Sequence, residues 1–525
     1  MYFKYSKSLQ RKCLFWIFPC LFYIFFLCLT RPVWAQKDLP LVQFEDLVYI
    51  GAFKGPNADT TARLTLNYSQ GALAFNPKST TNPDVPSLFI SCHKDIPQSN
   101  VGEISIPTPV ISKTSNLNEL PTATIIQHCA DVQNGTPTRI VHAQGGIGGL
   151  LVSGSTLYAS AYEGYPAGSL CSQGSHVIRP ILKLNEANAQ GPYKISNTAG
   201  GDCFVNGPMT WLPPEWRPLF GDKSAVAYQS STSIITSTSW GPAAFAFNPD
   251  DLGSTPASSL ALMYYTSDHA TLGRWNGPDP LVFAPPWNNS WNNAGDHGYR
   301  GLVIPNDTRS ALYFHAQGIG KYCYGDADVC GDPVGQYRGD HAYPYRFHIM
   351  AFDMNNWADV AAGKKKPWET TPYAVWPLVP SVLPFTTGDR DQQGGGAVYD
   401  PATKRIYWVQ PRANQALPII HVWEVKVAKT PVQASSHLFG SENAIKVFQK
   451  LHSTVYTIEL VDEKQATLNS PALRVYSSQG KLIADLSARL PGPLIEWNAS
   501  AVPNGIYSII YHTGSRSVSK RITVK

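Results

Sequence analysis

The sequence predicts an all-β protein that consists of a β-propeller followed by a small C-terminal β-sandwich. The chain has 41 glycines, 42 prolines, 26 tyrosines and 14 tryptophans, but only 15% of its residues are charged. This composition favours short strands and tight turns over helices. An apolar strand–turn–strand unit recurs along most of the chain, and a separate run of alternating strands lies near the C-terminus. Recurring units predict a propeller, and the final run predicts a sandwich.

The repeated unit has a glycine-led strand, a turn and an aromatic-rich strand. Its clear copies are "QGALAFNPKSTTNPDVPSLFIS", "GGLLVSGSTLYASAY", "RGLVIPNDTRSALYFHAQ" and "GGAVYDPATKRIYWVQ", and a weaker copy begins at "RPLFGDKSAVAYQSS". We expect five blades within a propeller domain of residues 36–428, or six if residues 100–140 contain another copy. A further strand, such as "LVYIGAF" (residues 47–53), is expected to precede each unit as the innermost strand. A β-sandwich or two smaller β domains is the alternative.

Residues 1–35 have the features of a secretory signal peptide. Basic residues precede an apolar stretch from Cys13 to Leu29, and small residues offer a cleavage site after Ala35. An uncleaved anchor is the alternative, because the stretch approaches the ~18 residues of a membrane span. The segment holds five basic residues and no acidic one, so its removal leaves 37 basic and 37 acidic residues. We therefore expect a secreted or cell-surface protein with no further membrane span and no nucleic-acid partner.

Six cysteines follow the predicted signal peptide. An even number in an exported chain predicts disulfides. Six cysteines allow fifteen pairings, and we expect neighbours to pair, which gives Cys92–Cys129, Cys171–Cys203 and Cys323–Cys330.

The last of these pairs lies in "HAQGIGKYCYGDADVCGDP" (residues 315–333), a segment that resembles a calcium loop in part. Asp326 and Asp328 take the first and third positions of an EF-hand loop, but Tyr337 stands where the bidentate glutamate belongs. The spacing between Cys323 and Cys330 also differs from that of a Cys-x-x-Cys redox motif. We expect a disulfide-stapled insertion in the fourth unit, after its third strand, with a looser calcium site as the weaker alternative. Asp-His pairs at 268–269, 296–297 and 340–341 could bind a divalent metal ion if the three loops converge, and this is a second weak alternative.

Polar clusters precede the glycine-led strand of several units. In a propeller such segments lie at one mouth of the central channel, where converging polar groups form the default binding site. Turn-forming residues with no further role are the alternative. The candidate ligand-binding residues are Asn67, Gln70, His142, Gln144, Asp296, His297, Arg300, Asp389, Arg390 and Asp391.

Two functions fit these features. The first is a module that binds a glycan or a protein through this polar rim. The second is a glycosidase-like hydrolase, which needs two carboxyl groups about 5–9.5 Å apart. The hydrolase hypothesis rests on a fold-level resemblance to five-bladed glycoside hydrolases, which place a catalytic aspartate on the first innermost strand. We favour the binding module because Glu45 and Asp46 precede the expected strand here and do not lie within it. The candidate carboxyl groups for hydrolysis are Glu163, Asp202, Asp296, Asp389 and Asp391.

Residues 429–445 are expected to form a linker and residues 446–525 the C-terminal sandwich. "LRVYSSQGKLIADL" and the later "VPNGIYSIIYHTGSRSVSKRITVK" resemble the C-terminal sorting domain of type IX secretion substrates. The positions that match the family pattern are Tyr476, Gly480, Lys481, Pro503, Gly505, Ile506, Tyr507, Lys520 and Arg521. The Tyr-Pro-Asn-Pro opening of that family is absent. The resemblance implies export across an outer membrane with the secretion machinery as a partner, whereas an Ig-like accessory domain is the alternative.

Overall fold

The structure is a computed structural model that describes most of residues 38–524 in two compact units, Met1–Thr430 and Pro431–Lys525. The predicted signal peptide and nearly all of the predicted linker lie outside the described residues. Within residues 38–524 the description omits 58–64, 68, 70, 93–98, 113, 141–144, 163–173, 197, 231–238, 240, 267, 270–272, 275–295, 319–322, 334–338, 342, 344, 379–394, 428–444, 450–453, 461–471, 478–481, 490–493 and 514–515. None of the described helices is both long enough and apolar enough to cross a membrane.

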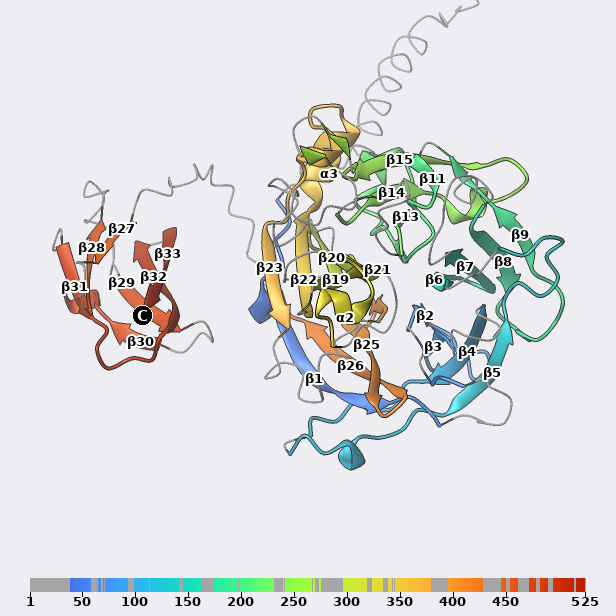
Figure 1. The fold of residues 1–525 in the computed structure, drawn as a ribbon, viewed down its shortest axis with the longest axis horizontal. Coiled ribbons are helices and arrows are strands. Elements are labelled where there is room, and N and C mark those ends of the chain that lie inside the picture. Colours follow the sequence, from blue (N-terminus) through green and yellow to red (C-terminus); the bar gives the residue numbers. More distant parts are fainter. Residues whose placement is uncertain are drawn as a thin grey trace, which may run out of the picture. The chain divides into compact units, whose positions relative to one another are not determined.

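Five β-sheets of four or five strands form the frame of the first unit (Figure 1), and β16 with β17 and β20 with β21 form two further two-stranded sheets among the described residues. The first sheet contains β2 (Leu73–Asn76), β3 (Ser87–Ser91), β4 (Asn100–Ser105) and β5 (Ile125–Asp131). The second contains β6 (Gly146–Ser153), β7 (Thr156–Tyr162), β8 (His176–Pro180) and β9 (Gln190–Tyr193). The third contains β12 (Met209–Trp211), β13 (Ala225–Ala227), β14 (Ala244–Phe247) and β15 (Ala257–Met263), with β10 (Ile195–Ser196) parallel to β15.

The fourth and fifth sheets complete the set. The fourth contains β18 (Asp296–Val303), β19 (Ser310–Gly318), β22 (Tyr345–Asp353) and β23 (Ala374–Leu378). The fifth contains β24 (Ala397–Asp400), β25 (Arg405–Asn414), β26 (Leu417–Val425) and β1 (Leu47–Lys54). Short strands outside these sheets are β11 (Ala199–Asp202), β16 (Asp268–His269), β17 (Gly273–Arg274), β20 (Cys323–Gly325) and β21 (Gly339–His341).

Helices are few and short among the described residues. The α-helices are α2 (Ala327–Cys330) and α3 (Met354–Ala361). Single turns of 3-10 helix occur at Phe44–Asp46, Leu117–Glu119, Arg217–Phe220, Pro249–Asp251, Pro367–Glu369 and Ser487–Arg489. The mostly β composition agrees with the predicted class.

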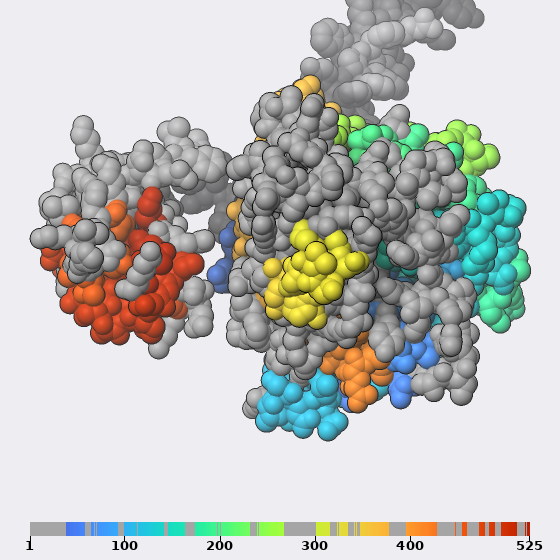
Figure 2. All heavy atoms as spheres, in the orientation of Figure 1, coloured from blue at the N-terminus to red at the C-terminus, as the bar shows by residue number. Residues whose placement is uncertain are grey.

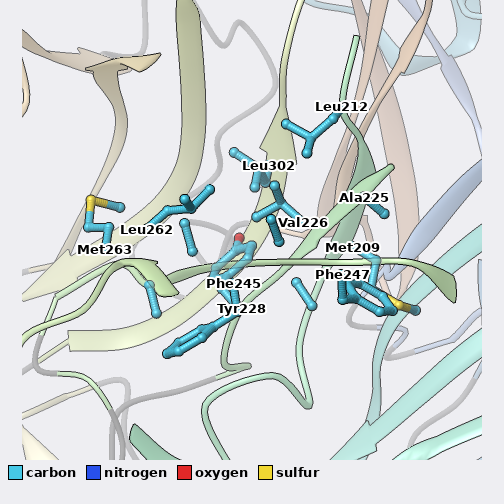
Figure 3. Close-up of a cluster of buried hydrophobic side chains, with 14 of the residues drawn as sticks. Met209, Leu212, Ala225, Val226, Tyr228, Phe245, Phe247, Leu262, Met263 and Leu302 are labelled. Carbon is cyan, nitrogen blue, oxygen red and sulfur yellow. The ribbon is translucent and has the colours of Figure 1, made fainter. Parts of the chain in front are cut away.

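The first strands of the five sheets form a closed ring. β2 contacts β6, β6 contacts β12, β12 contacts β18, β18 contacts β24, and β24 contacts β2 again. The sheets are accordingly arranged around a common centre (Figure 1), which makes the fold propeller-like. Apolar side chains fill the spaces between neighbouring sheets, and Figure 3 shows one such cluster around Phe245 of the third sheet and Leu302 of the fourth.

Glycine allows the first strands to approach one another. A Cβ on Gly149 of β6 would lie 2.7 Å from the Cα of Pro208, below the 3.0 Å that real Cβ atoms keep, and would also overlap the carbonyl oxygen of Gly207. Between the fifth and first sheets, the N–H of Gly396 donates a hydrogen bond of 2.8 Å to the carbonyl oxygen of Gly71. The glycine-led start of the repeated unit therefore marks close contact between backbones.

This arrangement corrects the expected strand order. The segment "LVYIGAF" forms β1, which pairs with β26 as the outermost strand of the fifth sheet and not as an innermost strand. The glycine-led strand is itself the first strand in each sheet. The prediction was wrong because pairing between distant segments, here residues 47–54 with 419–425, has no local signal in the sequence.

β1 is also held along its other edge. The connection between β4 and β5, residues 106–124, crosses to the fifth sheet and is called the strap below (Figure 1). The backbones of Val110 and Ala52 exchange two hydrogen bonds of 3.0 Å, and the N–H of Lys54 donates to Pro121 at 2.8 Å. The strand that closes the ring is thus paired on one side with its own sheet and on the other with a segment of the first sheet.

The second unit is a β-sandwich of two sheets around one core. One sheet contains β27 (Ile445–Gln449), β28 (Val455–Leu460) and β31 (Leu494–Asn498). The other contains β30 (Leu482–Asp485), β29 (Ala472–Ser477), β32 (Gly505–Thr513) and β33 (Arg516–Val524). Ile458 and Trp497 of the first sheet share the core with Val475 and Ile509 of the second. The hydroxyl of Tyr507 donates to the carbonyl of Pro503 at 2.6 Å.

We predict that Gly149→Ala destabilises the first unit by at least about 2 kcal/mol, because the new methyl group overlaps the backbone of the next sheet. Gly253→Ala is the matched control, since a Cβ there meets no atom within 4 Å and the position has no positive φ. It should change stability by less than about 0.5 kcal/mol. Denaturant unfolding of both variants tests this, and equal effects would contradict close packing at Gly149.

Candidate functional site

The candidate residues belong to segments that join strand ends at one edge of the five sheets. Counted outward from the centre, the first four strands of each sheet run antiparallel to their neighbours. The connections from a fourth strand to the next first strand and those from a second to a third strand therefore leave from the same edge, called the first-strand rim below. The sequence prediction placed the polar clusters before second strands. The structure corrects this, because three of these clusters precede the first strands β2, β6 and β24, and the cluster at Asp296 begins the first strand β18 itself.

The structure describes few of these candidates in atomic detail. Asn67 is half-buried, and its N–H donates to the hydroxyl of Thr65 at 3.0 Å. Asp296, His297 and Arg300 lie in β18, whose start pairs Asp296 with Gln317, and only their backbone is described. The ligand-binding candidates that lie outside the described residues are Gln70, His142, Gln144, Asp389, Arg390 and Asp391. The hydrolase candidate Glu163 also lies outside them.

A polar residue that the sequence analysis missed recurs near the rim end of every second strand. It ends the triplets "FIS", "YAS", "AYQ", "YFH" and "WVQ", and the five residues are Ser91, Ser160, Gln229, His315 and Gln410, all buried. A polar residue repeated at the end of an aromatic-rich strand was the available signal.

The described contacts show that Ser91 and Ser160 hold the backbone where first strands begin, and that Gln229 holds the segment before the third strand β14. Ser91 Oγ accepts a hydrogen bond of 3.0 Å from the N–H of Ala72. Ser160 Oγ donates to the carbonyl of Gly207, in the next sheet, at 2.7 Å. Gln229 Nε2 donates to Ser239 and Gly241 carbonyls at 2.9 Å each. Burying a polar group costs free energy unless it is hydrogen-bonded, so this arrangement fixes the frame from which the rim segments emerge.

In the fifth sheet the same position joins a chain of hydrogen bonds across three strands. His421 Nε2 lies 2.8 Å from Gln410 Oε1, and His421 Nδ1 lies 3.1 Å from the hydroxyl of Tyr49. Because the amide oxygen can only accept, Nε2 carries the proton and Nδ1 accepts from Tyr49. The imidazole is fully buried against Trp408 and Trp423. Burial lowers the pKa of His421 to about 3, so the ring is neutral at physiological pH.

Asp202 is the hydrolase candidate whose side chain the structure describes. Its Oδ1 accepts from the N–H of Ile195 at 3.2 Å and lies 3.5 Å from Ser175 Oγ. Burial raises the pKa of Asp202 to about 6, and only 4% of the residue is exposed. Beside it, burial lowers the pKa of His176 to about 3. A carboxyl group so enclosed anchors the connection between the second and third sheets and does not reach a substrate in solvent.

The stapled insertion, residues 323–341, leaves the fourth sheet at the first-strand rim. It lies between β19 and β22, which are the second and third strands, and not after the third strand as expected. A disulfide joins Cys323 to Cys330, with the Cα atoms 5.5 Å apart. Figure 2 shows this segment in yellow on the face of the first unit seen in that view. Asp326 and Asp328 are exposed, and Val329 between them and Cys330 is 77% exposed.

A buried pair secures the base of the insertion. His341 Nδ1 lies 2.7 Å from Asp332 Oδ2, and His341 Nε2 lies 3.2 Å from the carbonyl oxygen of Gly325. Both residues are almost fully buried. Both ring nitrogens of His341 are engaged, so the Asp340-His341 pair cannot offer this imidazole to a metal. Among the described residues, no group of three His, Cys, Asp or Glu side chains is placed to hold a metal ion.

Disulfides also hold other parts of the first unit. Cys92 is bonded to Cys129, which ties the end of β3 to β5. Cys203 is disulfide-bonded, and its expected partner, Cys171, lies outside the described residues. Disulfides of this kind persist in oxidising compartments, which agrees with an extracellular protein.

Comparisons with known proteins add little to this geometry. No family model matches the chain, and no curated protein sequence matches it. Among solved structures, the chain is similar to the Dos1 propeller, with a TM-score of 0.23 and 9% identity over 91% of this chain and 96% of that one. It is also similar to dimeric latent PorU from Porphyromonas gingivalis, with a TM-score of 0.12 and 8% identity over 72% of this chain and 32% of that one.

We predict that His421→Gln reduces the acid sensitivity of the first unit. The folded imidazole resists protonation down to pH about 3, whereas the unfolded one takes up a proton below its ordinary pKa of 6.5. The unfolded state therefore binds more protons in this window, and stability falls as the pH is lowered through it. Lowering the pH from 7 to 5 therefore reduces the free energy of unfolding by about 2 kcal/mol.

When the pH is lowered from 7 to 5, the free energy of unfolding of the variant should fall by about 2 kcal/mol less than that of the native protein. Denaturant unfolding at the two pH values measures the difference. His128→Gln, which removes an exposed imidazole, is the matched control and should keep the native slope. The same pH dependence in native protein and His421→Gln would contradict the burial of a neutral imidazole.

Proposed function

We propose that the protein is an exported five-bladed β-propeller that binds a glycan or protein ligand at its first-strand rim. The second unit, in this proposal, directs the chain through the type IX secretion machinery. The blade count is supported by the five sheets, by the ring of contacts among their first strands and by the closure of the fifth sheet through β1.

The observation that carries the binding proposal is the unequal use of the two rims. The two longest connections between successive strands of the five sheets, residues 264–295 and 319–344, both belong to the first-strand rim. The longest connection on the opposite rim, residues 354–373, is shorter than either of them. Short turns occur on both rims, at 154–155 on the opposite rim and at 415–416 on the first-strand rim. Long connections on a rigid scaffold commonly carry binding function, and every polar cluster identified from the sequence belongs to this rim.

The stapled insertion adds a preorganised contact element to that rim. Its disulfide and the buried pair between His341 and Asp332 limit its motion, so little conformational entropy is lost when it meets a ligand. It displays Val329 beside two exposed carboxylates, Asp326 and Asp328. An apolar side chain with polar neighbours on a rigid loop fits a recognition role.

A glycosidase has less support. It requires a pair of carboxyl groups that reach the substrate, and Asp202 is enclosed. The remaining carboxylate candidates lack a described side chain, so the proposal of hydrolysis rests on residue type alone. The binding module needs only the polar rim, which the topology supports directly.

We predict that a panel of polysaccharides and surface proteins contains a ligand whose affinity falls at least about tenfold in the Asp296→Ala, Asp389→Ala double variant, because charged groups are lost from the binding rim. Asp84→Ala is the control, since this exposed carboxylate lies between β2 and β3 on the opposite rim. Calorimetry measures binding, and sugar analysis of the mixture detects cleavage. Binding that survives the double variant would contradict the proposed rim, and release of smaller sugars would favour the hydrolase.

The sorting proposal rests on the sandwich fold of the second unit and on the sequence positions that match the sorting family. Gly505, Ile506 and Tyr507 begin β32, and Lys520 lies exposed on the final strand β33. A turn followed by two long terminal strands is the arrangement that the resemblance implies.

We predict that a chain ending at residue 430 is retained inside a bacterium that secretes the full chain by the type IX route, because it lacks the sorting domain. Immunoblots of periplasm and medium measure this. The full chain in a strain without the type IX pore should also be retained. Secretion of the shortened chain, or of the full chain without the pore, would contradict the proposal.

A further inference from the structure

A pocket of about 490 Å³ lies where the outer strand of the second sheet meets the third sheet. Three separate segments line it, and none of them contains a residue of the polar clusters or of the stapled insertion. Its lining includes Gly135, Gln190, Tyr193, Lys194, Ser254 and Pro256. Its volume falls within the range of roughly 300–1,000 Å³ that small-molecule sites occupy.

The walls of the pocket are joined by backbone hydrogen bonds. The N–H of Ala257 donates to the carbonyl of Lys194 at 2.9 Å, which continues into the parallel pairing of β10 with β15. The N–H of Ala189 donates to Asn134 at 3.0 Å, and that of Ser175 donates to Tyr193 at 3.1 Å. The pocket is therefore present before a ligand arrives, which lowers the entropic cost of binding.

One wall depends on a glycine. Gly135 has a φ of +108°, and a Cβ there would lie 2.6 Å from the carbonyl carbon of Ala187. This close approach brings the segment after β5 against the turn before β9. The wall is thus held by the same kind of backbone contact as the ring of first strands.

The lining combines an apolar surface with hydrogen-bonding groups and one cation. The half-exposed ring of Tyr193 and the exposed Pro256 offer apolar faces, while Gln190 and Ser254 offer an amide and a hydroxyl. Sugar rings match such a surface, because they present C–H groups on one face and hydroxyl groups at the edge. A flat aromatic side chain with polar neighbours suits this ligand class.

Lys194 adds a preference for negative charge. Its side chain is exposed and forms no ion pair with any residue that the structure describes. The nearby Asp202 feels this charge, but it is only 4% exposed. Lys194 lines the pocket with an exposed side chain whereas Asp202 is enclosed, and a ligand carboxylate within reach of the ammonium group would gain a charge-assisted hydrogen bond.

We infer that this pocket binds a single sugar unit that carries a carboxylate, of the uronic acid class. The inference does not depend on the first-strand rim, because the two sites share no residue. A variant can therefore lose ligand binding at the rim and keep sugar binding at the pocket, or the reverse.

In the test, the exported full chain is titrated with glucuronic acid and separately with glucose, and ligand-observed NMR measures binding. Glucuronic acid should bind about tenfold more tightly than glucose, since the sugars differ in the carboxylate that Lys194 would bind. Lys194→Met keeps the aliphatic stem and should abolish this preference. Lys364→Met removes an exposed lysine outside the pocket and should leave it unchanged.

Two further variants separate this site from the rim. Ser254→Trp places a large side chain at the pocket and should block both sugars, while its melting temperature shows whether the fold is retained. The Asp296→Ala, Asp389→Ala double variant should bind glucuronic acid as the native chain does. Equal affinity for the two sugars, absence of binding at millimolar concentration, or a preference that survives Lys194→Met would overturn the inference.

Discussion

Backbone contact between first strands is the constraint on which the rest of the first unit depends. At Gly149 and Gly396 neighbouring sheets approach so closely that a side chain would meet a backbone atom. This contact determines how near each sheet lies to the next, and hence how the apolar residues between sheets pack. It also determines where each first strand begins, and therefore where the rim segments leave the frame.

Closure of the ring depends on residues that are far apart in the chain. β1 supplies the last strand of a sheet whose other strands lie more than three hundred residues later, and the strap holds its free edge. The hydrogen bonds from Tyr49 to His421 and on to Gln410 cross the same sheet inside an apolar cluster. An unpaired polar group there would be costly. These bonds therefore stabilise the pairing of β1 with β26 and also fix its register.

The described polar residues divide between two roles. Those beneath the rim, such as Ser160 and Gln229, are buried and use their hydrogen-bonding groups to hold backbone. On the stapled insertion, Asp326 and Asp328 are exposed, whereas His341 and Asp332 are buried and, with the disulfide, hold the shape of the insertion. A rigid frame with rigid projections favours recognition, because binding then requires little ordering.

The sequence alone determined the β class and the repeated unit, because alternation and turn residues are local properties. It did not determine the disulfide pairing, since six cysteines allow fifteen pairings. The structure confirms the expected neighbour pairs Cys92–Cys129 and Cys323–Cys330. The sequence also did not determine which strand of each unit is innermost, since that depends on glycine contacts such as Gly149 with Gly207 in a different sheet. Nor did it reveal that Asp202 and His341 are enclosed, since burial follows from the packing of distant segments. Only the tertiary structure decided these points: residue type shows what a side chain can do, and packing decides whether solvent or a ligand reaches it.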